Sequence, residues 1–128
     1  VDELRVGSWV EIQEDEEHKL RGKLAAGFTV SALPAGDKQS TLLSMFTFCM
    51  QHGMLWVGNP ILPEQHQGVP YDEAANRLGS WSGLMAQADK ASPGHAFAPG
   101  DIKTAHLFGQ HFANTLLRLH AGATLEHA

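Results

Sequence analysis

The first residues of the chain alternate between apolar and polar side chains. Such alternation predicts a strand with one face buried and one face in water. The acidic run at 14–17 predicts a solvated turn after it, so residues 1–22 are expected to open a hairpin. Its first strand would pair antiparallel with residues 20–28. The apolar face of that strand is formed by Leu4, Val6, Val10 and Ile12.

A largely apolar run over 24–30 predicts a strand that is buried on both faces. After a loop rich in Pro and Gly, apolar residues recur at helical spacing and predict a helix over 41–52. Asp37 or Ser40 can cap the start of this helix, and Gly53 can end it in a left-handed conformation. The apolar stripe consists of Leu42, Met45, Phe46 and Cys49.

A second short apolar run, bounded by glycines, predicts another buried strand over 54–58. A strand, a helix and a strand at this spacing form a right-handed unit whose strands are parallel. Residues 59–99 carry five of the six prolines and predict a long excursion, with one short strand or helical turn near Met85. A clear apolar stripe predicts a last helix over 101–120, with Asp101 as its N-cap.

These elements predict a single α/β domain over residues 1–128, with 121–128 as a frayed tail. Its sheet would hold two parallel strands with flanking helices, plus the antiparallel N-terminal hairpin strand. Two parallel strands alone leave a long unpaired edge, which sheets avoid. The hairpin strand is expected to cover part of that edge, and a second copy of the chain to cover the rest.

Composition narrows the classes of function. The net charge of −5 argues against nucleic acid or an anionic membrane surface as a partner. No apolar stretch reaches the roughly 20 residues that span a bilayer. The single cysteine, Cys49, excludes an internal disulfide, fits a cytoplasmic location, and is expected to be a buried, inert thiol. The last helix has no two histidines three or four residues apart, so no metal site is predicted.

Five stretches, in order, match landmarks of a known family: "GKLAAGFTVS", "STLLSMF", "QHGMLWVG", "NRLGSWSG" and "DIKTAHLFGQHFANTLLRL". Through them, residues 23–119 resemble the C-terminal half of flavodoxin-like NAD(P)H:quinone oxidoreductases. This group includes proteins of the tryptophan-repressor-binding type and those similar to NADPH-dependent FMN reductases. The resemblance implies a flavodoxin-like C-terminal half over 23–120, with FMN as cofactor and a quinone and NAD(P)H as substrates.

The resemblance also implies a position for FMN. In this family the flavin lies at the C-terminal ends of the parallel strands. The loop that would lie against the isoalloxazine ring consists of Val30, Ser31, Ala32, Leu33, Pro34 and Ala35. His52 matches the family histidine at the flavin edge, where it would stabilise reduced, anionic flavin. The loop departs from the small, glycine-rich family pattern, since it reads "SALPAGDK".

A larger departure lies at the front of the chain. The family binds the FMN phosphate in a Ser/Thr-rich loop after its first strand, at the N-terminus of the first helix. Residues 1–22 are too few to supply that half. They faintly resemble the opening hairpin of a PilZ-like domain, without its Arg-rich and Asp-x-Ser-x-x-Gly patterns. The stretch "GDKQST" could imitate a phosphate loop, but it lacks the Walker spacing and is interpreted as a helix cap.

Two functions fit these observations. One is a flavodoxin-like NAD(P)H-dependent quinone or FMN reductase domain that lacks the phosphate-binding half, which argues against independent activity. The other is a noncatalytic, truncated or rearranged flavodoxin-like protein that acts as an oligomerisation or interaction module. Neither function assigns a catalytic residue. His52 lies at the predicted C-terminus of a helix, where the helix dipole interacts favourably with a histidine whether or not flavin is present. A homodimer is expected in both, with interface residues Trp81, Leu84 and Met85.

Overall fold

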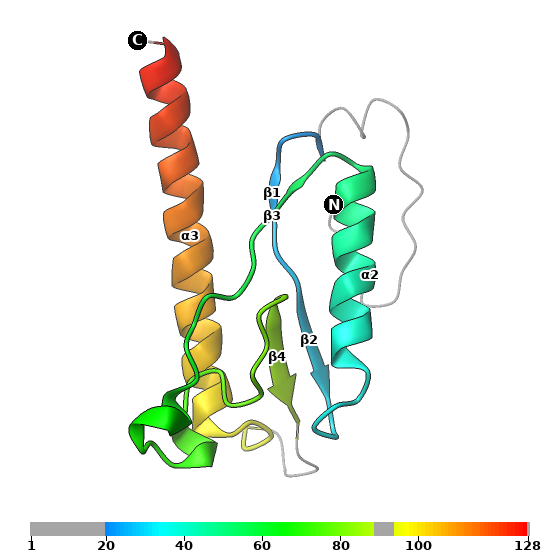
Figure 1. Ribbon diagram of the computed structural model, residues 1–128, viewed down its shortest axis with the longest axis vertical. Coiled ribbons are helices and arrows are strands. Elements are labelled where there is room, and N and C mark those ends of the chain that lie inside the picture. The colour runs from blue at the N-terminus through cyan, green and yellow to red at the C-terminus, as the bar shows by residue number, and fades with distance from the viewer. Residues whose placement is uncertain (1–19, 89–93, 128) are drawn as a thin grey trace.

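A computed structural model describes residues 20–88 and 94–127 of the chain (Figure 1). It is an α/β structure in which two helices flank a small set of strands, as the sequence predicts. The strands are β1 (Leu24–Ala25), β2 (Phe28–Ser31), β3 (Leu55–Trp56) and β4 (Leu84–Gln87). The helices are α2 (Lys38–Gln51) and α3 (Pro99–His127), with two 3-10 turns at Glu64–Gln67 and Tyr71–Glu73.

All the strand pairs are parallel within the described part of the chain. β1 and β2 follow one another along residues 24–31; β1 pairs with β3, and β2 pairs with β4. These pairs confirm the parallel strands predicted over 24–30 and 54–58. They also confirm the short strand predicted near Met85.

β1 and β2 together form one nearly continuous extended segment, here called the β1–β2 line, and β3 and β4 both lie along the same edge of it. In an extended strand, the backbone groups of every second residue point to the same edge. The carbonyl groups that accept N–H bonds from the neighbouring strands all belong to odd-numbered residues. These bonds join Leu55 to Lys23 (2.8 Å), Val57 to Ala25 (2.8 Å), Leu84 to Gly27 (3.0 Å) and Ala88 to Ser31 (2.9 Å). No described residue forms a strand at the opposite edge.

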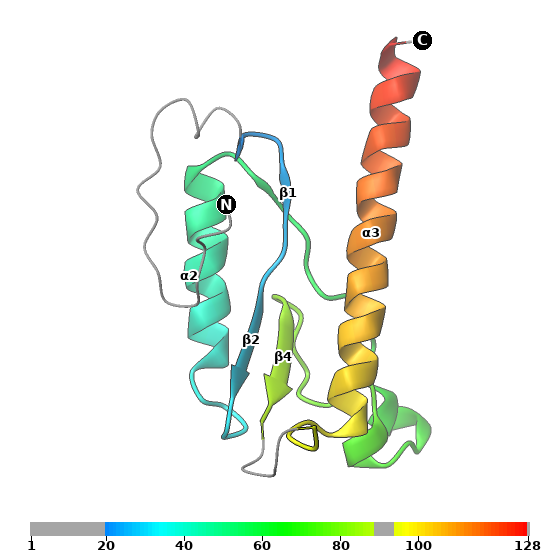
Figure 2. The same cartoon turned by 180° about the vertical axis from the view of Figure 1, so that it is seen from behind.

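The two helices lie on opposite sides of the strands, with α3 beside β4 and α2 beyond β2 (Figures 1 and 2). α2 packs closely because residue 27 is a glycine. A Cβ atom there would lie 2.7 Å from Trp56 and 2.8 Å from Met45. Leu42 is fully buried in this layer, and the ring of Phe46 meets that of Trp56 edge to face at 5.7 Å. Cys49 is buried, as predicted.

The helix ends differ in part from the prediction. α2 begins at Lys38, three residues before the predicted start. Asp37 is its N-cap residue, but its backbone is left-handed and its side chain makes no capping hydrogen bond. The predicted end at Gly53 is correct, since its φ is 69°.

α3 begins at Pro99, a favourable residue for the first helical turn, because its missing N–H group would have no partner there. Asp101 therefore lies inside the first turn, so its prediction as an N-cap is wrong. The helix continues to His127, beyond the predicted end at residue 120.

The predicted N-terminal hairpin strand lies outside the described residues. Of its segment, only residues 20–22 are described, and the Gly22 N–H donates to the Gly53 carbonyl at 2.7 Å. Neither helix in the described ranges has an apolar stretch long enough to cross a bilayer.

Candidate functional site

The loop after β2 lies at the carboxyl end of the parallel strands, where open α/β sheets bind their ligands. Residues 32–37 of this loop are exposed. The Ser31 hydroxyl donates to the Leu33 carbonyl at 2.9 Å and closes the bend. Gly36 has a φ of 50°, and a Cβ atom there would lie 2.1 Å from the Ser31 Oγ. The loop therefore requires glycine at this position.

A buried lysine holds this loop from inside. The Lys38 side chain is only 1% exposed, and its Nζ donates to the Leu33 carbonyl (2.6 Å) and the Ser31 Oγ (2.5 Å). Burial lowers the pKa of the Lys38 ammonium; the charge of Asp101 opposes this change and that of Arg77 adds to it. The sequence indicated only a helix cap here, because no local pattern shows that a lysine will fold back beneath its own loop.

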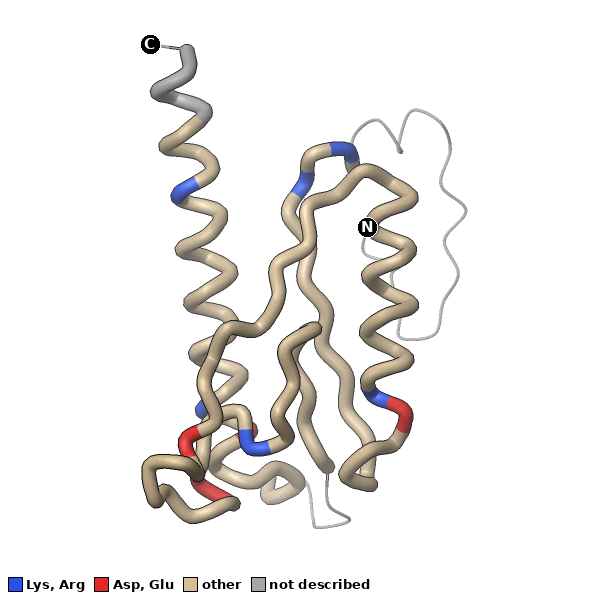
Figure 3. The backbone as a smooth tube through the Cα atoms, viewed as in Figure 1, with Lys and Arg blue, Asp and Glu red and all other residues tan. Residues whose placement is uncertain are grey.

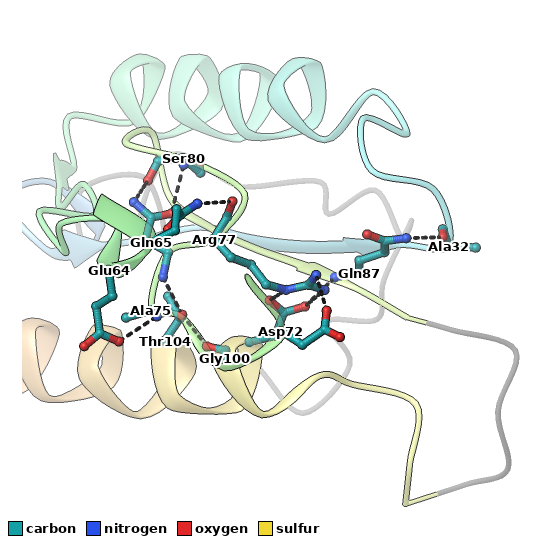
Figure 4. Close-up of polar contacts among 12 residues, drawn as sticks. Ala32, Glu64, Gln65, Asp72, Ala75, Arg77, Ser80, Gln87, Gly100 and Thr104 are labelled. Carbon is teal, nitrogen blue, oxygen red and sulfur yellow. Dashed lines mark hydrogen bonds and ion pairs between the residues drawn. The ribbon is translucent and has the colours of Figure 1, made fainter. Parts of the chain in front are cut away.

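A buried ion pair joins the start of α3 to the segment before β4. Arg77 donates to both carboxylate oxygens of Asp101, Nε to Oδ1 at 2.7 Å and Nη2 to Oδ2 at 3.0 Å. Hydrogen bonding to Asp101 raises the pKa of Arg77. The same carboxylate accepts the backbone N–H of Gln87 at 2.9 Å. The Gln87 side chain then donates to the Ala32 carbonyl at 3.1 Å, which links the ion pair to the loop (Figure 4).

The segment between β3 and β4 is fixed by polar contacts, although its sequence has weak periodicity. Asn76 donates from its side chain to the Ile61 and Ser80 carbonyls, and its backbone N–H donates to the Thr104 hydroxyl. Glu64 accepts hydrogen bonds from the Ala75 N–H (2.8 Å) and the Lys103 ammonium (2.5 Å). The Asn76–Thr104 and Glu64–Lys103 contacts thus tie this segment to the first turns of α3. Figure 4 shows Thr104 beside the segment, and within the segment the bond between Ala75 and Glu64.

Most charged residues of the described structure lie in loops or at helix starts, Arg118 lies well inside α3, and none lies on a strand (Figure 3). Two hollows of the described structure differ in the polarity of the residues that line them. A polar hollow of about 360 Å³ lies at the carboxyl end of β4 and includes Asp72, Arg77, Gln87 and His95. An apolar groove of about 420 Å³ runs between the strands and α3. It is lined by Phe28, Val30, Leu84, Ala86, Phe97, Asp101, Ile102, Ala105 and His106.

The structure does not bring all the predicted flavin residues together. Val30 and Ser31 end β2, and residues 32–35 lie in the loop after it, as the resemblance implies. His52 is the C-cap of α2, at the other end of a 14-residue helix. At 1.5 Å per residue this separates it from the loop by about 20 Å. One flavin ring lying against the loop would not reach His52 of the same chain.

The surroundings of His52 are aromatic. Its ring centroid lies 4.5 Å from that of Phe48, and its Nδ1 is buried with no hydrogen-bond partner among the described residues. Of the predicted interface residues, Trp81 is exposed. Leu84 and Met85 are half-buried neighbours in β4, so their side chains point to opposite faces of the sheet.

Comparison with known proteins supports the flavodoxin-like relationship. The chain is similar to "Flavodoxin FldP" of Pseudomonas aeruginosa (strain UCBPP-PA14), with 33% identity over 99 residues, which is 77% of this chain and 53% of the relative. It is 42% identical over 60 residues to "NAD(P)H dehydrogenase (quinone)" of Archaeoglobus fulgidus, covering 47% of this chain and 31% of the relative. A protein of the same name from Azorhizobium caulinodans is 32% identical over 100 residues, 70% of this chain and 49% of the relative.

The chain therefore spans about half the length, or less, of the curated relatives that it matches. No family model matches it, and no solved structure gives a significant match. Nothing in these comparisons supports the PilZ-like resemblance of residues 1–22. The identities of 32–42% and the parallel βαβ arrangement together relate this chain to the flavodoxin-like NAD(P)H:quinone oxidoreductases.

Proposed function

We propose that this chain forms the ring-binding half of an FMN-dependent NAD(P)H:quinone oxidoreductase, and that its described residues do not include the half that binds the FMN phosphate. The observation that carries the proposal is the loop over 31–37. It follows a parallel strand at the carboxyl edge of the sheet, is exposed, and is held in shape by the buried Lys38. Relatives named flavodoxin and NAD(P)H dehydrogenase (quinone) support the choice of cofactor and substrates.

The chemistry of the loop fits one edge of a flavin ring. Among the described residues, the backbone N–H groups of Ala32, Leu33 and Gly36 donate to no protein acceptor, so they can meet the ring's carbonyl oxygens. Leu33 and Pro34 add exposed apolar surface for the ring. When bound, FMN would accept a hydride from NAD(P)H and pass electrons to a quinone. The role of this chain is to hold and orient the ring.

Lys38 is a positioning residue in this scheme. Its ammonium group already donates to Ser31 and Leu33, so it fixes the loop and does not itself need to contact the flavin. Gln87 supports the loop from β4 through the Ala32 carbonyl. We leave His52 out of this site because it lies at the far end of α2.

FMN should bind weakly to this chain alone. The described residues contain no Ser/Thr-rich loop that leads from a first strand into a helix, and phosphate would normally bind at such a loop. Each charge-assisted hydrogen bond is worth about 1.5–3 kcal/mol, so losing two weakens binding on the order of a hundredfold or more. We expect the protein to purify without bound FMN.

A titration with FMN, followed by quenching of flavin fluorescence, tests the site. We expect weak, saturable binding that Lys38→Met weakens further, because the loop loses its internal support. Lys103→Met is the matched control, since this lysine pairs with Glu64 away from the loop. Equal FMN affinity in Lys38→Met and the unchanged protein would contradict the site. NADPH oxidation with a quinone, dependent on added FMN, would demonstrate the reductase activity.

The alternative function is a noncatalytic oligomerisation module, and one observation favours it. After Lys38, α2 has no charged residue, and it exposes the apolar side chains of Leu43, Phe46, Phe48 and Met50. Trp81 is also exposed. Both functions include a homodimer that buries Trp81 and part of 59–85. Light scattering after size exclusion would detect it, and Trp81→Arg should dissociate it. A dimer without FMN-dependent NADPH oxidation would favour the noncatalytic module.

A further inference from the structure

Three charged side chains are buried among the described residues, and their charges do not balance. Lys38 is 1% exposed, Arg77 is 8% exposed and Asp101 is 3% exposed. Arg77 donates to both carboxylate oxygens of Asp101, so these two charges form a pair. The two oxygens that accept hydrogen bonds from the Lys38 ammonium group are both neutral, the Leu33 carbonyl and the Ser31 hydroxyl. Within the described ranges, Lys38 is therefore a buried positive charge without a carboxylate partner.

A buried charge without a partner normally destabilises a small domain. Burial removes the water that solvates the Lys38 ammonium group, and hydrogen bonds to neutral oxygens replace that water only in part. Burial accordingly lowers the pKa of this group, while the charge of Asp101 opposes the change. An apolar side chain would fill the same space without this cost. A ligand with a negative charge close to Lys38 would compensate the burial, and by linkage it would favour the charged lysine in return.

The positive charge lies directly beneath the exposed loop at 32–36. The Lys38 Nζ lies 2.6 Å from the Leu33 carbonyl oxygen, and the Leu33 side chain is 68% exposed to solvent. The same loop carries the backbone N–H groups of Ala32, Leu33 and Gly36, which donate to no acceptor among the described residues. Backbone N–H groups and a buried cation both attract anions. Asp37 carries an opposing charge at the end of the loop, but it is exposed, so salt and water screen it.

We propose that Lys38 makes the loop at 31–37 selective for the charge of its ligand, so that it binds the anionic, reduced flavin ring more tightly than the neutral, oxidised ring. The ligand is the ring of the proposed flavin site, on which this inference rests. Lys38 thus has a role beyond holding the loop in shape. The family resemblance gives the stabilisation of reduced flavin to His52, which lies about 20 Å away at the other end of α2. Lys38 is the buried cation that contacts the loop itself.

Riboflavin tests this selectivity without the contribution of a phosphate group. Its oxidised form, and its chemically reduced form under argon, are titrated into the labelled full chain at pH 8, where the reduced ring is anionic and the oxidised ring is neutral. Binding is followed by the amide shifts at 32–36. We expect the unchanged protein to bind the reduced form at least tenfold more tightly. A tenfold preference raises the midpoint potential of the bound ring by about 30 mV, which spectroelectrochemistry measures independently.

Variants separate the charge of Lys38 from its support of the loop. Lys38→Gln keeps a hydrogen-bond donor but removes the charge, so the preference for the reduced form should fall at least fivefold. Lys38→Met removes the donor as well, so the preference should fall equally and both forms should bind more weakly. Lys103→Gln is the matched control and should keep the preference, because this lysine is 42% exposed and pairs with Glu64. His52→Gln should also keep it, because this histidine lies far from the loop.

The outcomes distinguish a failure of this selectivity from a failure of the flavin site. Equal affinities of the unchanged protein for the two forms, with amide shifts at 32–36, would overturn the role of Lys38 and leave the proposed site standing; this result needs no variant to fold. A preference that Lys38→Gln keeps and His52→Gln abolishes would assign the selectivity to the histidine and would also overturn the proposal. No shift at 32–36 with either form would refute both the selectivity and the flavin site.

Discussion

Replacing Arg77 with alanine should destabilise the fold strongly. The side chains of Arg77 and Asp101 are 6% and 3% exposed, and two hydrogen bonds join them. Without the guanidinium group, the Asp101 carboxylate stays buried with the Gln87 N–H as its remaining partner among the contacts described above. Leaving one partner of a buried ion pair uncompensated costs about 3–5 kcal/mol. Since small domains have about 5–15 kcal/mol of stability, this is a large share of the total.

Urea denaturation followed by circular dichroism measures this loss. Asp72→Asn is the control, because Asp72 is 78% exposed and lies 3.7 Å from Arg77; we expect a change below about 1 kcal/mol. The double variant Arg77→Met with Asp101→Asn should recover most of the loss. It removes both charges and keeps an oxygen that can accept the Gln87 N–H. A loss in Arg77→Ala no larger than that in Asp72→Asn would refute the reasoning.

Three further predictions concern packing and titration. Gly27→Ala should lower the free energy of unfolding by about 1–3 kcal/mol, since the added Cβ would lie 2.7 Å from a tryptophan carbon atom. Gly109→Ala, whose Cβ would have no atom within 4 Å, should raise it by about 0.5–1 kcal/mol in the same denaturation assay. Burial raises the pKa of the Cys49 thiol, so native protein should react with a thiol reagent at pH 8 at least tenfold more slowly than protein in urea. Equal rates would contradict its burial. Hydrogen bonding to Lys103, then to a backbone N–H, lowers the pKa of Glu64. Its stabilising contribution is therefore present above the pKa of the unfolded state and lost as pH falls through the lowered folded value. Glu64→Gln should remove that part of the acid dependence of stability, and an unchanged acid dependence would contradict this.

The elements with a clear hydrophobic pattern could be predicted from the sequence. The apolar run over 24–30 and the apolar stripe of α2 predicted a strand and a helix, because a buried strand and an amphipathic helix each have a distinctive period. The order strand, helix, strand then predicted the parallel pairing. The pairing of β2 with β4 could not be predicted, because the segment between β3 and β4 has weak periodicity and gives no register for β4. Register between such strands depends on packing of the whole sheet.

The polar part of the site was harder to predict. Arg77 and Asp101 are 24 residues apart, and nothing local to either indicates its partner. Asp101 also has the features of an N-cap, which led to the wrong role. For His52, the sequence did contain the contrary signal. A predicted helix over 41–52 already separates the histidine from the loop by several turns, whereas motif matching by position ignores that distance.

The most direct test of the central claim is a nuclear magnetic resonance titration of the labelled protein with FMN. The proposed site predicts that the largest amide shifts occur in the exposed loop at 32–36, with smaller shifts at Gln87, which bonds to that loop. The amide of His52, about 20 Å away along α2, should not shift when the titration is done on the monomeric Trp81→Arg variant. Saturating shifts around His52 with none at 32–36, or no shift at millimolar FMN, would contradict the claim that this loop holds the flavin ring.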